Sequence, residues 1–522
     1  PARTLAAKMA DLWLQPRPGT DAAIALAMIH VIISENLYDQ AFVQRWCHGF
    51  KELAQRAAHY PPNVAARFAG VAEDDIVRAA RMYADGPSVF VSGHGIDASS
   101  AGVQTFRGFH ALVAITGNLD RPGGNHRVKR PPGFRNYVEL LHDPDFRLPG
   151  EIERQTIGAD RFPLWAGPEG WQTATHNPSV IEAILTGEPY PVRAMYASGV
   201  NIAVTYPNTR RTMEALRALD FLAVTTHMMT PTAELADIVL PKTTGLEEEE
   251  ISLDTGAPCV SFTRAVLPPR GEARSDFDIA IGLADRLEMR GIEARRFLPW
   301  KTKREFNAFM LGDGIDLDTL ERVGFAEFDF ETGNFESAGF KTPTGKIELF
   351  SERLDALGLD PLPDYAPPRI ERETAAVRAA YPLVLLTGAR EKTYHHSRYR
   401  EQAWARKVSP YPRVEIHPET AASNGLERDD WVRIETPGMG DGCELMVTPT
   451  TDVAPGILRT GMGWWLPEAA GPERGALTVN VNAAMSYGGP WDPVTGSADT
   501  RGLPCRMVKI ETENAAMAGA AE

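Results

Sequence analysis

The stretch Thr387–Ser397, which reads TGAREKTYHHS, indicates most directly how this chain is built. It follows the apolar run Pro382–Leu386 and brings two adjacent histidines, an arginine, a tyrosine and three hydroxyl side chains into one polar loop. A strand that ends in hydrogen-bond donors is where α/β and barrel proteins place a ligand, because the strand holds the loop rigid. For this loop alone, a hydrated surface loop is an equal alternative. Further polar, glycine-rich strand ends along the chain favour ligand binding.

Composition and charge exclude several broad classes of protein. The chain has 522 residues, 43% hydrophobic and 24% charged, so we expect about two to four globular domains. The net charge of −15 at pH 7 argues against a general binder of nucleic acid or membrane surfaces, since such proteins need a basic face. Apolar runs of about 18 residues do not occur, so no direct membrane span is predicted.

The cysteines of this sequence give no sign of a metal centre. They are widely separated and form no CxxC pair, so neither a zinc site nor an iron–sulfur cluster is encoded among them. Buried free thiols are the preferred interpretation, with disulfides as the alternative. The residues are Cys47, Cys259, Cys443 and Cys505.

Helical and extended segments alternate from residue 1 to about 300. The predicted helices are 22–33, 74–83, 103–115 and 212–219, and the predicted strands are 88–92, 192–196, 221–225 and 237–240. Strands separated by helices predict an α/β fold with a doubly wound parallel sheet. Ligands bind such sheets at the carboxyl ends of the strands, which here carry His94, Asn201 and the pair Thr225-Thr226.

The C-terminal part has a different pattern. Residues 297–370 are rich in Pro, Gly and Phe and are expected to form irregular connections. Beyond about 380, short β-rich runs alternate with turn clusters, which predicts a closed β-barrel. The runs are 383–386, 413–416, 431–435, 444–448, 456–460 and 505–510.

The turn Pro18–Asp21 precedes the first long helix and is a candidate anion site. Backbone N–H groups and the Thr20 hydroxyl at a helix N-terminus suit a phosphate. The Asp21 carboxylate opposes a phosphate and would instead accept a hydrogen bond from a base or ribose. A plain capped helix, with Thr20 or Asp21 as the cap, is the alternative.

Other polar groups have both a functional and a structural interpretation. His395 and His396 could exchange protons or simply donate hydrogen bonds. Trp464-Trp465 could wall a pocket or fill a core. Asn480 and Asn482 alternate with valines, so both amides are expected on one face. The acidic run 247–250 is expected to be a solvated face.

Several segments together resemble the catalytic subunit of the molybdenum/tungsten bis-pterin-guanine-dinucleotide oxidoreductases, the dimethyl sulfoxide reductase family. They occur in the family's order and cover nearly the whole chain. The Trp-Trp-Leu-Pro and His-His-Ser versions look most similar to the acetylene hydratase and thiosulfate/polysulfide reductase-like branches. The segments are Arg17–Ala23, Ile115–Asn125, Thr230–Pro241, Thr342–Phe350, Glu415–Pro418 with Ala421, and Gly463–Pro467 leading to Asn482.

The resemblance implies a role for particular residues. The cofactor would be bis-molybdopterin guanine dinucleotide carrying molybdenum or tungsten, with His395 and His396 as proton-exchanging groups. No residue of this sequence matches the family's metal ligand. Cofactor contacts are implied for Gly19, Thr20, Asp21, His94, Asn201, Thr225, Thr226, Asp276, Thr387, Gly388, Arg390 and Asn482. Many family members carry an acidic residue where this chain has Thr226, so that contact departs from the pattern.

The resemblance also implies an organisation and an activity. The ranges are 1–84, the tail of a dinucleotide-binding α/β domain; 85–300, a second α/β cofactor-binding domain; 301–372, an irregular connection; and 373–522, a double-psi-like β-barrel domain that binds the molybdopterin dinucleotide. The family's cluster-binding cysteines, with their 4Fe–4S cluster, and its metal ligand are expected before Pro1, so the chain is interpreted as an N-terminally truncated catalytic subunit.

The implied reaction is oxygen-atom or two-electron transfer to a small-molecule substrate such as a sulfur compound or oxyanion. An iron–sulfur electron-transfer subunit is the implied partner, and no nucleic acid is expected. A non-redox hydratase or hydroxyl transferase of the same family is the first alternative. A non-catalytic cofactor-binding subunit is the second.

Overall fold

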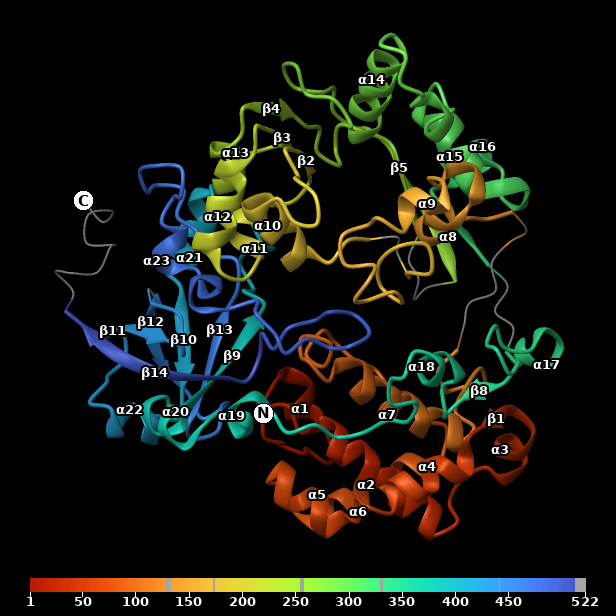
Figure 1. The fold of residues 1–522 in the computed structure, drawn as a ribbon, viewed down its shortest axis with the longest axis vertical. Coiled ribbons are helices and arrows are strands. Elements are labelled where there is room, and N and C mark those ends of the chain that lie inside the picture. Colours follow the sequence, from red (N-terminus) through yellow and green to blue (C-terminus); the bar gives the residue numbers. More distant parts are fainter. Residues whose placement is uncertain are drawn as a thin grey trace. The chain divides into compact units, whose positions relative to one another are not determined.

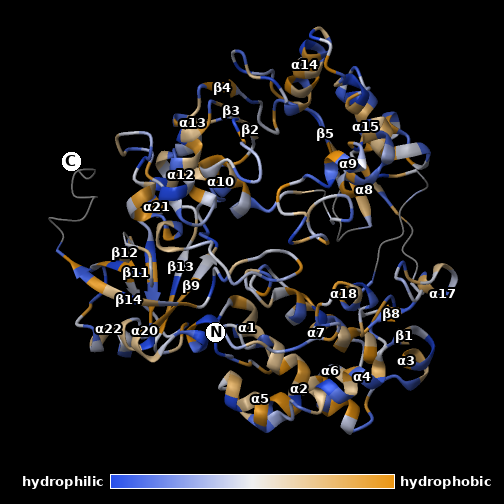
Figure 2. Ribbon diagram, in the orientation of Figure 1, coloured by the Kyte–Doolittle hydropathy of each residue, from blue (hydrophilic) through white to orange (hydrophobic). Residues whose placement is uncertain are grey.

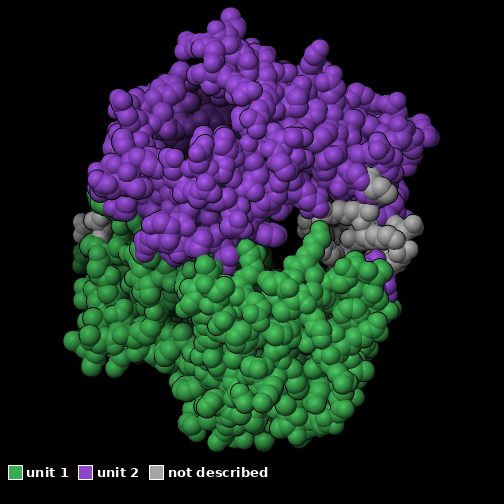
Figure 3. All heavy atoms as spheres, turned by 45° about the vertical axis from the view of Figure 1, so that its right-hand side comes forward, with its two compact units in different colours: residues 1–126, 202–213, 335–522 green, residues 127–201, 214–334 purple. Residues whose placement is uncertain are grey.

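The computed structural model describes residues 1–126, 131, 133–171, 174–253, 258–328, 332–440 and 442–511. Its contacts divide the chain into two compact units, which Figure 3 colours separately. Unit 1 comprises Pro1–His126, Ile202–Met213 and Phe335–Glu522, and unit 2 comprises Arg127–Asn201 and Glu214–Asn334. Both units combine segments that are distant in sequence, and the four ranges inferred from the sequence remain predictions.

Helix α2 (Asp21–Ser34) is the centre of the helical part of unit 1. Apolar side chains lie all round it and nearly all are buried, as expected for a helix enclosed by others (Figure 2). It contacts α5 (Pro62–Ala69), α6 (Glu73–Ala84) and α7 (Gly102–Ile115). The three helices predicted in this region, α2, α6 and α7, are confirmed.

Short elements complete this helical part. Strand β1 pairs in parallel with β8, which brings the segment around residue 347 back to the helices. The elements are α1 (Leu5–Met9), α3 (Gln40–Trp46), β1 (Cys47–His48), α4 (Phe50–Ala57), α17 (Phe335–Ala338), β8 (Ile347–Glu348), α18 (Glu352–Ala356), α19 (Arg369–Arg372) and α20 (Ala375–Ala380).

A closed six-stranded barrel forms the C-terminal part of unit 1 (Figure 1). In barrel order its strands are β10 (Arg413–Ile416), β12 (Cys443–Pro449), β11 (Trp431–Glu435), β14 (Leu503–Ile510), β9 (Leu383–Ala389) and β13 (Ile457–Gly461). The pairs β10–β12 and β9–β13 are parallel, and the other pairs are antiparallel. All six predicted strands are present, and the predicted barrel is confirmed.

Side chains that point inward at every second position of the strands fill the interior of the barrel. Leu385, Val414, Val432 and Leu445 are fully buried, since successive residues of a strand point to opposite faces. Short helices α21 (Ala403–Val408), α22 (Pro418–Ser423) and α23 (Ala476–Val479) follow the strands or connect them.

All four cysteines are free, and three of them are buried, which agrees with the expected thiols. Cys443 and Cys505 belong to the barrel core. Burial raises the pKa of the Cys443 thiol to about 12 and raises the pKa of Cys505 as well. Neither thiol is therefore a nucleophile near neutral pH.

Unit 2 contains the predicted parallel sheet. Its order is β2 (Ala194–Ser198), β3 (Phe221–Thr226) and β4 (Ile238–Pro241), all parallel. Three helices accompany it: α10 (Asn177–Thr186), α12 (Thr209–Ala218), which begins in the unit 1 segment, and α13 (Pro231–Glu234). Another helix of unit 1, α11 (Ile202–Thr205), lies between β2 and α12 in sequence.

The remainder of unit 2 is more regular than the sequence suggested. Strands β5 (Glu250–Leu253), β6 (Cys259–Thr263) and β7 (Phe325–Glu327) form an antiparallel sheet that was not predicted. Helices α15 (Lys303–Leu311) and α16 (Leu317–Val323) lie in the stretch expected to be irregular. Their buried leucines and Met310 pack in one cluster with Val260 and Phe262, and this packing outweighs a composition rich in Gly and Phe. The other helices are α8 (Tyr137–His142), α9 (Gly150–Glu153) and α14 (Asp276–Glu288).

The acidic run 247–250 is not the solvated face that was expected. Glu247 is buried, and its carboxylate accepts hydrogen bonds from the backbone N–H and hydroxyl of Thr244 and from the backbone N–H of Arg270. Glu250 pairs with Lys303 at 2.9 Å. The first and last residues of the run therefore fix local backbone rather than only meeting water.

The predicted strand 88–92 is wrong. The segment is extended but pairs with no strand among the described residues. Two asparagine side chains replace a neighbouring strand: Asn118 accepts from the Ser88 N–H at 3.0 Å, and Asn125 both accepts from the Phe90 N–H and donates to its carbonyl. These amides meet the backbone's hydrogen-bonding needs without a sheet.

Among the described residues, no helix combines the length and apolar character needed to cross a membrane.

Candidate functional site

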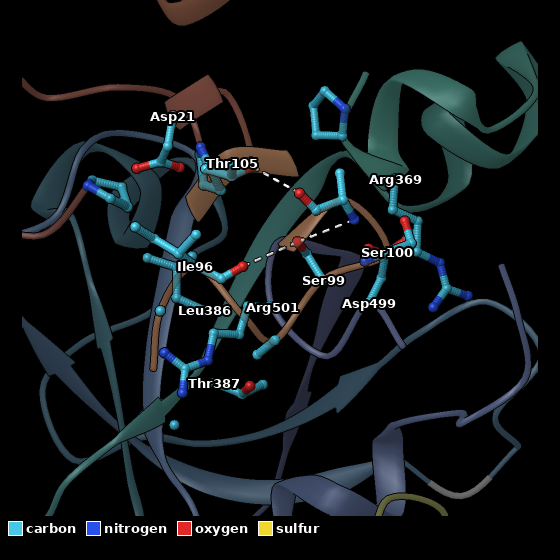
Figure 4. A pocket seen from close by; sticks show the side chains of 18 of the residues that line it. Asp21, Ile96, Ser99, Ser100, Thr105, Arg369, Leu386, Thr387, Asp499 and Arg501 are labelled. Atoms are coloured by element: carbon cyan, nitrogen blue, oxygen red, sulfur yellow. Dashed lines mark hydrogen bonds between the residues drawn. The ribbon is translucent and has the colours of Figure 1, made fainter. Parts of the chain in front are cut away.

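A cavity of about 370 Å³ lies in unit 1, where the first helices meet the barrel (Figure 4). Four of the predicted site residues line it: Gly19 and Asp21 at the start of α2, and Thr387 and Gly388 at the end of β9. Segments more than 360 positions apart in sequence thus meet at one cavity. Thr4, Ser99, Ser100 and Thr105 also line the cavity, and the hydroxyls of the last three already donate within the chain, to the Ile96 carbonyl, the Asp499 carboxylate and the Ala101 carbonyl.

Arg501 is the cavity residue that sequence reasoning missed. Its guanidinium lies across Gly388, where an added Cβ would come within 2.7 Å of Nη2, and close to Gly95, where the distance would be 3.5 Å. Gly388 has a φ of 78°, a conformation that side chains rarely adopt. Burial lowers the pKa of Arg501, while the nearby Asp97 acts in the opposite direction. The glycines therefore leave room for a guanidinium that faces the cavity.

The other cavity arginines are paired with carboxylates. Arg369 pairs with Glu373 at 3.5 Å and Arg459 with Glu415 at 2.8 Å. The third, Arg372, pairs with Asp499. No ion pair involving Arg501 occurs among the described residues, so it is the cavity cation available to an anion from outside the chain.

Two buried carboxylates hold the loop that carries Arg501. Asp492 accepts from the Val103 N–H in the first turn of α7 at 3.0 Å, and Asp499 accepts from the Ser100 N–H at 2.8 Å. Carboxylates are favourable at a helix N-terminus, where N–H groups lack partners. The Thr387 hydroxyl donates to the carbonyl of Thr500, which ties this loop to β9.

The start of α2 differs in detail from the predicted anion turn. Thr20 is fully buried, and its hydroxyl donates to the carbonyl of Arg17 at 2.7 Å instead of capping the helix. Asp21 lines the cavity, and burial raises the pKa of its carboxyl. Thr20 thus shapes the turn, and Asp21 is the member of the pair that faces a ligand.

His395 and His396 line a second, smaller cavity of about 50 Å³ in unit 1, together with Arg390, Glu391 and Arg400. The histidine rings are perpendicular, with centroids 5.0 Å apart. Burial lowers the pKa of His396, and the positive charges of its neighbours lower it further. A neutral imidazole is therefore favoured over a wider pH range than in an isolated histidine.

Glu391 is the carboxylate of this smaller cavity. Burial raises its pKa, although the charge of Arg400 acts in the opposite direction. A carboxyl whose folded pKa exceeds its unfolded value destabilises the fold above the unfolded pKa and loses that effect at lower pH.

We expect Glu391→Gln to raise the thermal midpoint of unfolding at pH 8 relative to the native chain, with a smaller difference near pH 4. Circular dichroism at the two pH values, with the exposed Glu401→Gln as the control, measures this. An equal shift at both pH values would contradict the assignment of Glu391 as a buried, hard-to-ionise carboxyl.

Asn482 has a structural partner within unit 1. Its amide donates to the carbonyl of Val204 at 2.8 Å, and the amide of Asn480 donates to the same carbonyl at 2.9 Å. The two amides therefore reach the same carbonyl, but from the 3-10 helix Val481–Ala484 and the residue that caps it rather than from one face of an extended segment. These two hydrogen bonds hold α11 against the segment before β14.

Asn482→Ala should lower the stability of unit 1 by about 1 kcal/mol, the usual net contribution of one hydrogen bond. Urea unfolding followed by tryptophan fluorescence measures the change. Asn424→Ala, at the exposed end of α22, serves as the control. No change in midpoint would show that the Val204 contact does not stabilise the unit.

In unit 2 the predicted residues lie at the carboxyl edge of the parallel sheet. Asp276, at the start of α14, accepts from the Ser198 hydroxyl at 2.8 Å and pairs with Lys242, so it joins the ends of β2 and β4. Thr225, at the end of β3, is fully buried, and its hydroxyl has no hydrogen-bond partner among the described residues. An unsatisfied buried hydroxyl at a strand end is a position where a ligand group would restore a hydrogen bond.

Two further predicted residues of this edge have partners in the chain. The Asn201 side-chain carbonyl accepts from the Thr232 hydroxyl at 2.7 Å. The Thr226 hydroxyl donates to the carbonyl of Met228 at 3.0 Å and shapes the loop after β3. Lys242 was missed by sequence reasoning, and Ser198, in the polar segment after the predicted strand 192–196, was not among the implied cofactor contacts.

His94 stands apart from these groups. It is exposed in a turn, with its ring nitrogen 2.9 Å from the Asp97 carboxylate, and does not line the larger cavity, whereas Gly95 does. Most of the other predicted site residues fall into three sets, the larger cavity, the histidine cavity and the edge of the unit 2 sheet, whereas His94, Thr20 and Asn482 belong to none of them.

The donor sets fit a long anionic cofactor with a nucleotide part. The larger cavity offers one free guanidinium, several hydroxyls and a carboxyl that can face a base or ribose. The sheet edge of unit 2 offers a lysine, a serine and an unsatisfied threonine hydroxyl. Within the described residues, no group of three or more His, Cys, Asp or Glu could hold a metal ion.

The parallel sheet, the closed barrel and the polar strand ends agree with the class of protein that the sequence resembles, and the family comparison shows that class. Residues 1–286 match the family Molybdopterin oxidoreductase, and residues 383–504 match the Molydopterin dinucleotide binding domain. The chain belongs to the molybdopterin oxidoreductase family, and the resemblance to the dimethyl sulfoxide reductase family is confirmed.

Several individual proteins of this family are similar to the chain. The chain is 30% identical to acetylene hydratase of Syntrophotalea acetylenica, over 96% of this chain and 71% of the relative. It is 28% identical to the thiosulfate reductase molybdopterin-containing subunit of Salmonella typhimurium, over 95% and 68%. Dopamine dehydroxylase of Eggerthella lenta is 28% identical over 88% of this chain but only 53% of the relative. Among solved structures, acetylene hydratase from Pelobacter acetylenicus superposes with a TM-score of 0.88 at 29% identity, covering 98% of this chain and 73% of that one.

Proposed function

We propose that this chain binds bis-molybdopterin guanine dinucleotide and catalyses two-electron or oxygen-atom transfer to a small sulfur compound or oxyanion. The observation that carries the proposal is the larger cavity, where an unpaired guanidinium, a buried carboxyl and several hydroxyls from distant segments face one space. Family membership provides independent support.

In this proposal Arg501 binds a phosphate of one dinucleotide. The backbone amides of Thr387 and Gly388 and the hydroxyl of Thr387 flank that phosphate. Asp21 accepts a hydrogen bond from the base or ribose when it is ionised, and burial raises its pKa and so favours the protonated form that donates one. At the sheet edge of unit 2, Ser198, Thr225 and Asp276 contact the cofactor. Roles for Gly19, Thr20, His94, Asn201, Thr226, Arg390 and Asn482 rest on the resemblance alone.

The chain's own contribution to the chemistry lies in the smaller cavity. The cofactor, when bound, supplies a metal that exchanges two electrons with the substrate. His395 and His396 hold or release the accompanying proton at a ring nitrogen, and Arg390 attracts an anionic substrate. The lowered pKa of His396 favours its neutral ring near neutral pH, so the ring accepts a proton there and donates one mainly on the acid side of the ordinary histidine range.

The proposal extends to electron carriers. A partner subunit with iron–sulfur clusters and a 4Fe–4S cluster close to the cofactor would deliver electrons one at a time. The choice between molybdenum and tungsten belongs to the same proposal. Metal analysis tests the choice between molybdenum and tungsten. Colorimetric determination of iron and acid-labile sulfide tests for the iron–sulfur clusters.

A second candidate function is a non-redox hydratase, in which the metal acts as a Lewis acid. The relative with the highest identity among those named, acetylene hydratase, favours it. Both candidates need the same cofactor contacts, so the binding residues do not separate them.

Turnover assays separate the two functions. We expect the purified, metal-loaded chain to oxidise reduced methyl viologen when thiosulfate, tetrathionate, polysulfide or dimethyl sulfoxide is added. Conversion of acetylene to acetaldehyde without any change in viologen absorbance would favour the hydratase. Absence of both activities in a preparation with full metal and pterin content would contradict the proposed function.

A further inference from the structure

The two histidines stand on a turn that is held in an unfavourable conformation. The Arg398 N–H donates to the carbonyl of His395 at 2.9 Å and closes the turn, and His396, at its second position, has a φ of 53°. This left-handed region favours glycine, because a Cβ crowds the backbone there. A non-glycine residue keeps such a conformation only where the surrounding structure holds it, and such residues concentrate at functional sites.

A buried arginine provides that support. Arg400 is only 1% exposed, and its Nε–H donates to the carbonyl of His396 at 3.0 Å. Its guanidinium lies 4.4 Å from the ring centre of Trp464 and 4.5 Å from that of Tyr394, close enough for cation–π attraction to both rings. The rings therefore fix the guanidinium, and the guanidinium fixes the carbonyl of the strained residue.

The burial of Arg400 costs free energy, because its charged guanidinium is removed from water. Burial lowers the pKa of Arg400 to about 10, so the side chain is still charged at neutral pH. Its Nη1 has no hydrogen-bond partner among the described residues. A well-packed apolar side chain would fill the same space without a desolvated charge. Arginine at this position is therefore better explained by what it does for His396 than by packing.

We propose that Arg400 is a positioning residue, which holds the His396 turn in its left-handed conformation at the edge of the smaller cavity. The inference rests on the proposed function only for the role of His396 as a proton-exchanging group. Arg390, Glu391, Tyr394 and His395 line the same cavity, so together with Arg400 five charged or titratable groups surround the turn in addition to His396 itself. Of these five, Arg400 is the one whose side chain donates a hydrogen bond to the His396 carbonyl.

Hydrogen–deuterium exchange of the full chain, read by mass spectrometry on peptides spanning 394–402, tests the proposal without any turnover assay. We expect Arg400→Met to speed exchange of the Arg398 amide by about 10- to 100-fold, the equivalent of losing one charged hydrogen bond. Arg400→Lys should behave in the same way, because it keeps the charge but removes the Nε–H donor. Arg398→Met, in the same turn but with an exposed side chain, should leave exchange unchanged.

The double variant Arg400→Met with His396→Gly shows whether Arg400 acts by holding the left-handed backbone of residue 396. Glycine adopts a positive φ without strain, so in that background Arg400→Met should change exchange by less than about threefold. An equal acceleration in both backgrounds would overturn the proposal, since Arg400 would then merely pack the core. Normal exchange in Arg400→Lys would also overturn it, since charge alone would suffice. Should Arg400→Met not fold, which the protection of β9 and β13 reports in the same data, Arg400→Lys carries the test.

Discussion

Replacing His395 and His396 together with alanine is expected to lower kcat by about 10²- to 10⁴-fold, the usual contribution of a positioned proton donor or acceptor. The physical reason is that both rings line one small cavity beside Arg390 and Arg400, where no other imidazole contributes. Metal and pterin content should stay normal, because neither ring lines the larger cavity. The viologen-linked assay with the best substrate of the native chain measures the loss.

The pH dependence of the native rate gives an additional check. Since burial lowers the pKa of His396, its proton-donating form is populated only on the acid side of the ordinary histidine range. Reductive turnover should therefore fall as the pH rises towards neutrality. His59→Ala, an exposed histidine at the end of α4, is the matched control and should leave kcat unchanged. Normal turnover in the double variant would remove both histidines from the mechanism.

Arg501→Ala should reduce retention of the cofactor by about 10- to 100-fold, because a hydrogen bond between charged groups contributes roughly 1.5–3 kcal/mol. The guanidinium is the unpaired cation of the larger cavity among the described residues, so no neighbouring arginine replaces it without breaking an ion pair. Guanine nucleotide released by acid hydrolysis, compared with metal content after gel filtration, measures the loss.

An arginine on the strand that follows Arg501 provides the control. Arg506 lies on β14 and pairs with Glu435 outside the cavity, so Arg506→Ala should retain the cofactor fully. Full retention in Arg501→Ala would show that this guanidinium does not bind a phosphate. A barrel that no longer folds would appear as lost circular dichroism in the strand region and would be distinguishable from lost binding.

Local sequence patterns were sufficient to predict the barrel and the parallel sheet. Strands such as β10 and β11 have the predicted bounds, because alternating apolar residues bounded by turns leave few other arrangements. Gly19 and Asp21 were recognisable because they directly precede an apolar helix, and Thr387 and Gly388 because they directly follow an apolar strand. The structure brings these four together in one cavity.

Other features depend on contacts that a linear sequence does not contain. The segment 88–92 has the composition of a strand, but the amides of Asn118 and Asn125 take the place of a partner strand. Glu247 is indistinguishable from its acidic neighbours until Thr244 and Arg270 are seen to donate to it. Tertiary hydrogen bonds override composition in both cases.

Sequence reasoning missed Arg501 and Arg400 for a similar reason. Arg501 follows an irregular, glycine-containing loop, and no periodic pattern marks its direction; only the placement of Gly388 and Gly95 shows that it faces a cavity. Arg400 lies among polar residues in sequence and is nonetheless almost completely buried. Charged residues are rarely found inside, so sequence reasoning assigns them to the surface by default.

Metal and nucleotide analysis of the purified chain, expressed anaerobically in a host that makes the cofactor, tests the central claim most directly. We predict about one molybdenum or tungsten atom and about two guanine nucleotides per chain, as a bis-pterin-guanine-dinucleotide site requires. A folded chain that carries neither metal nor guanine nucleotide under those conditions would contradict the account.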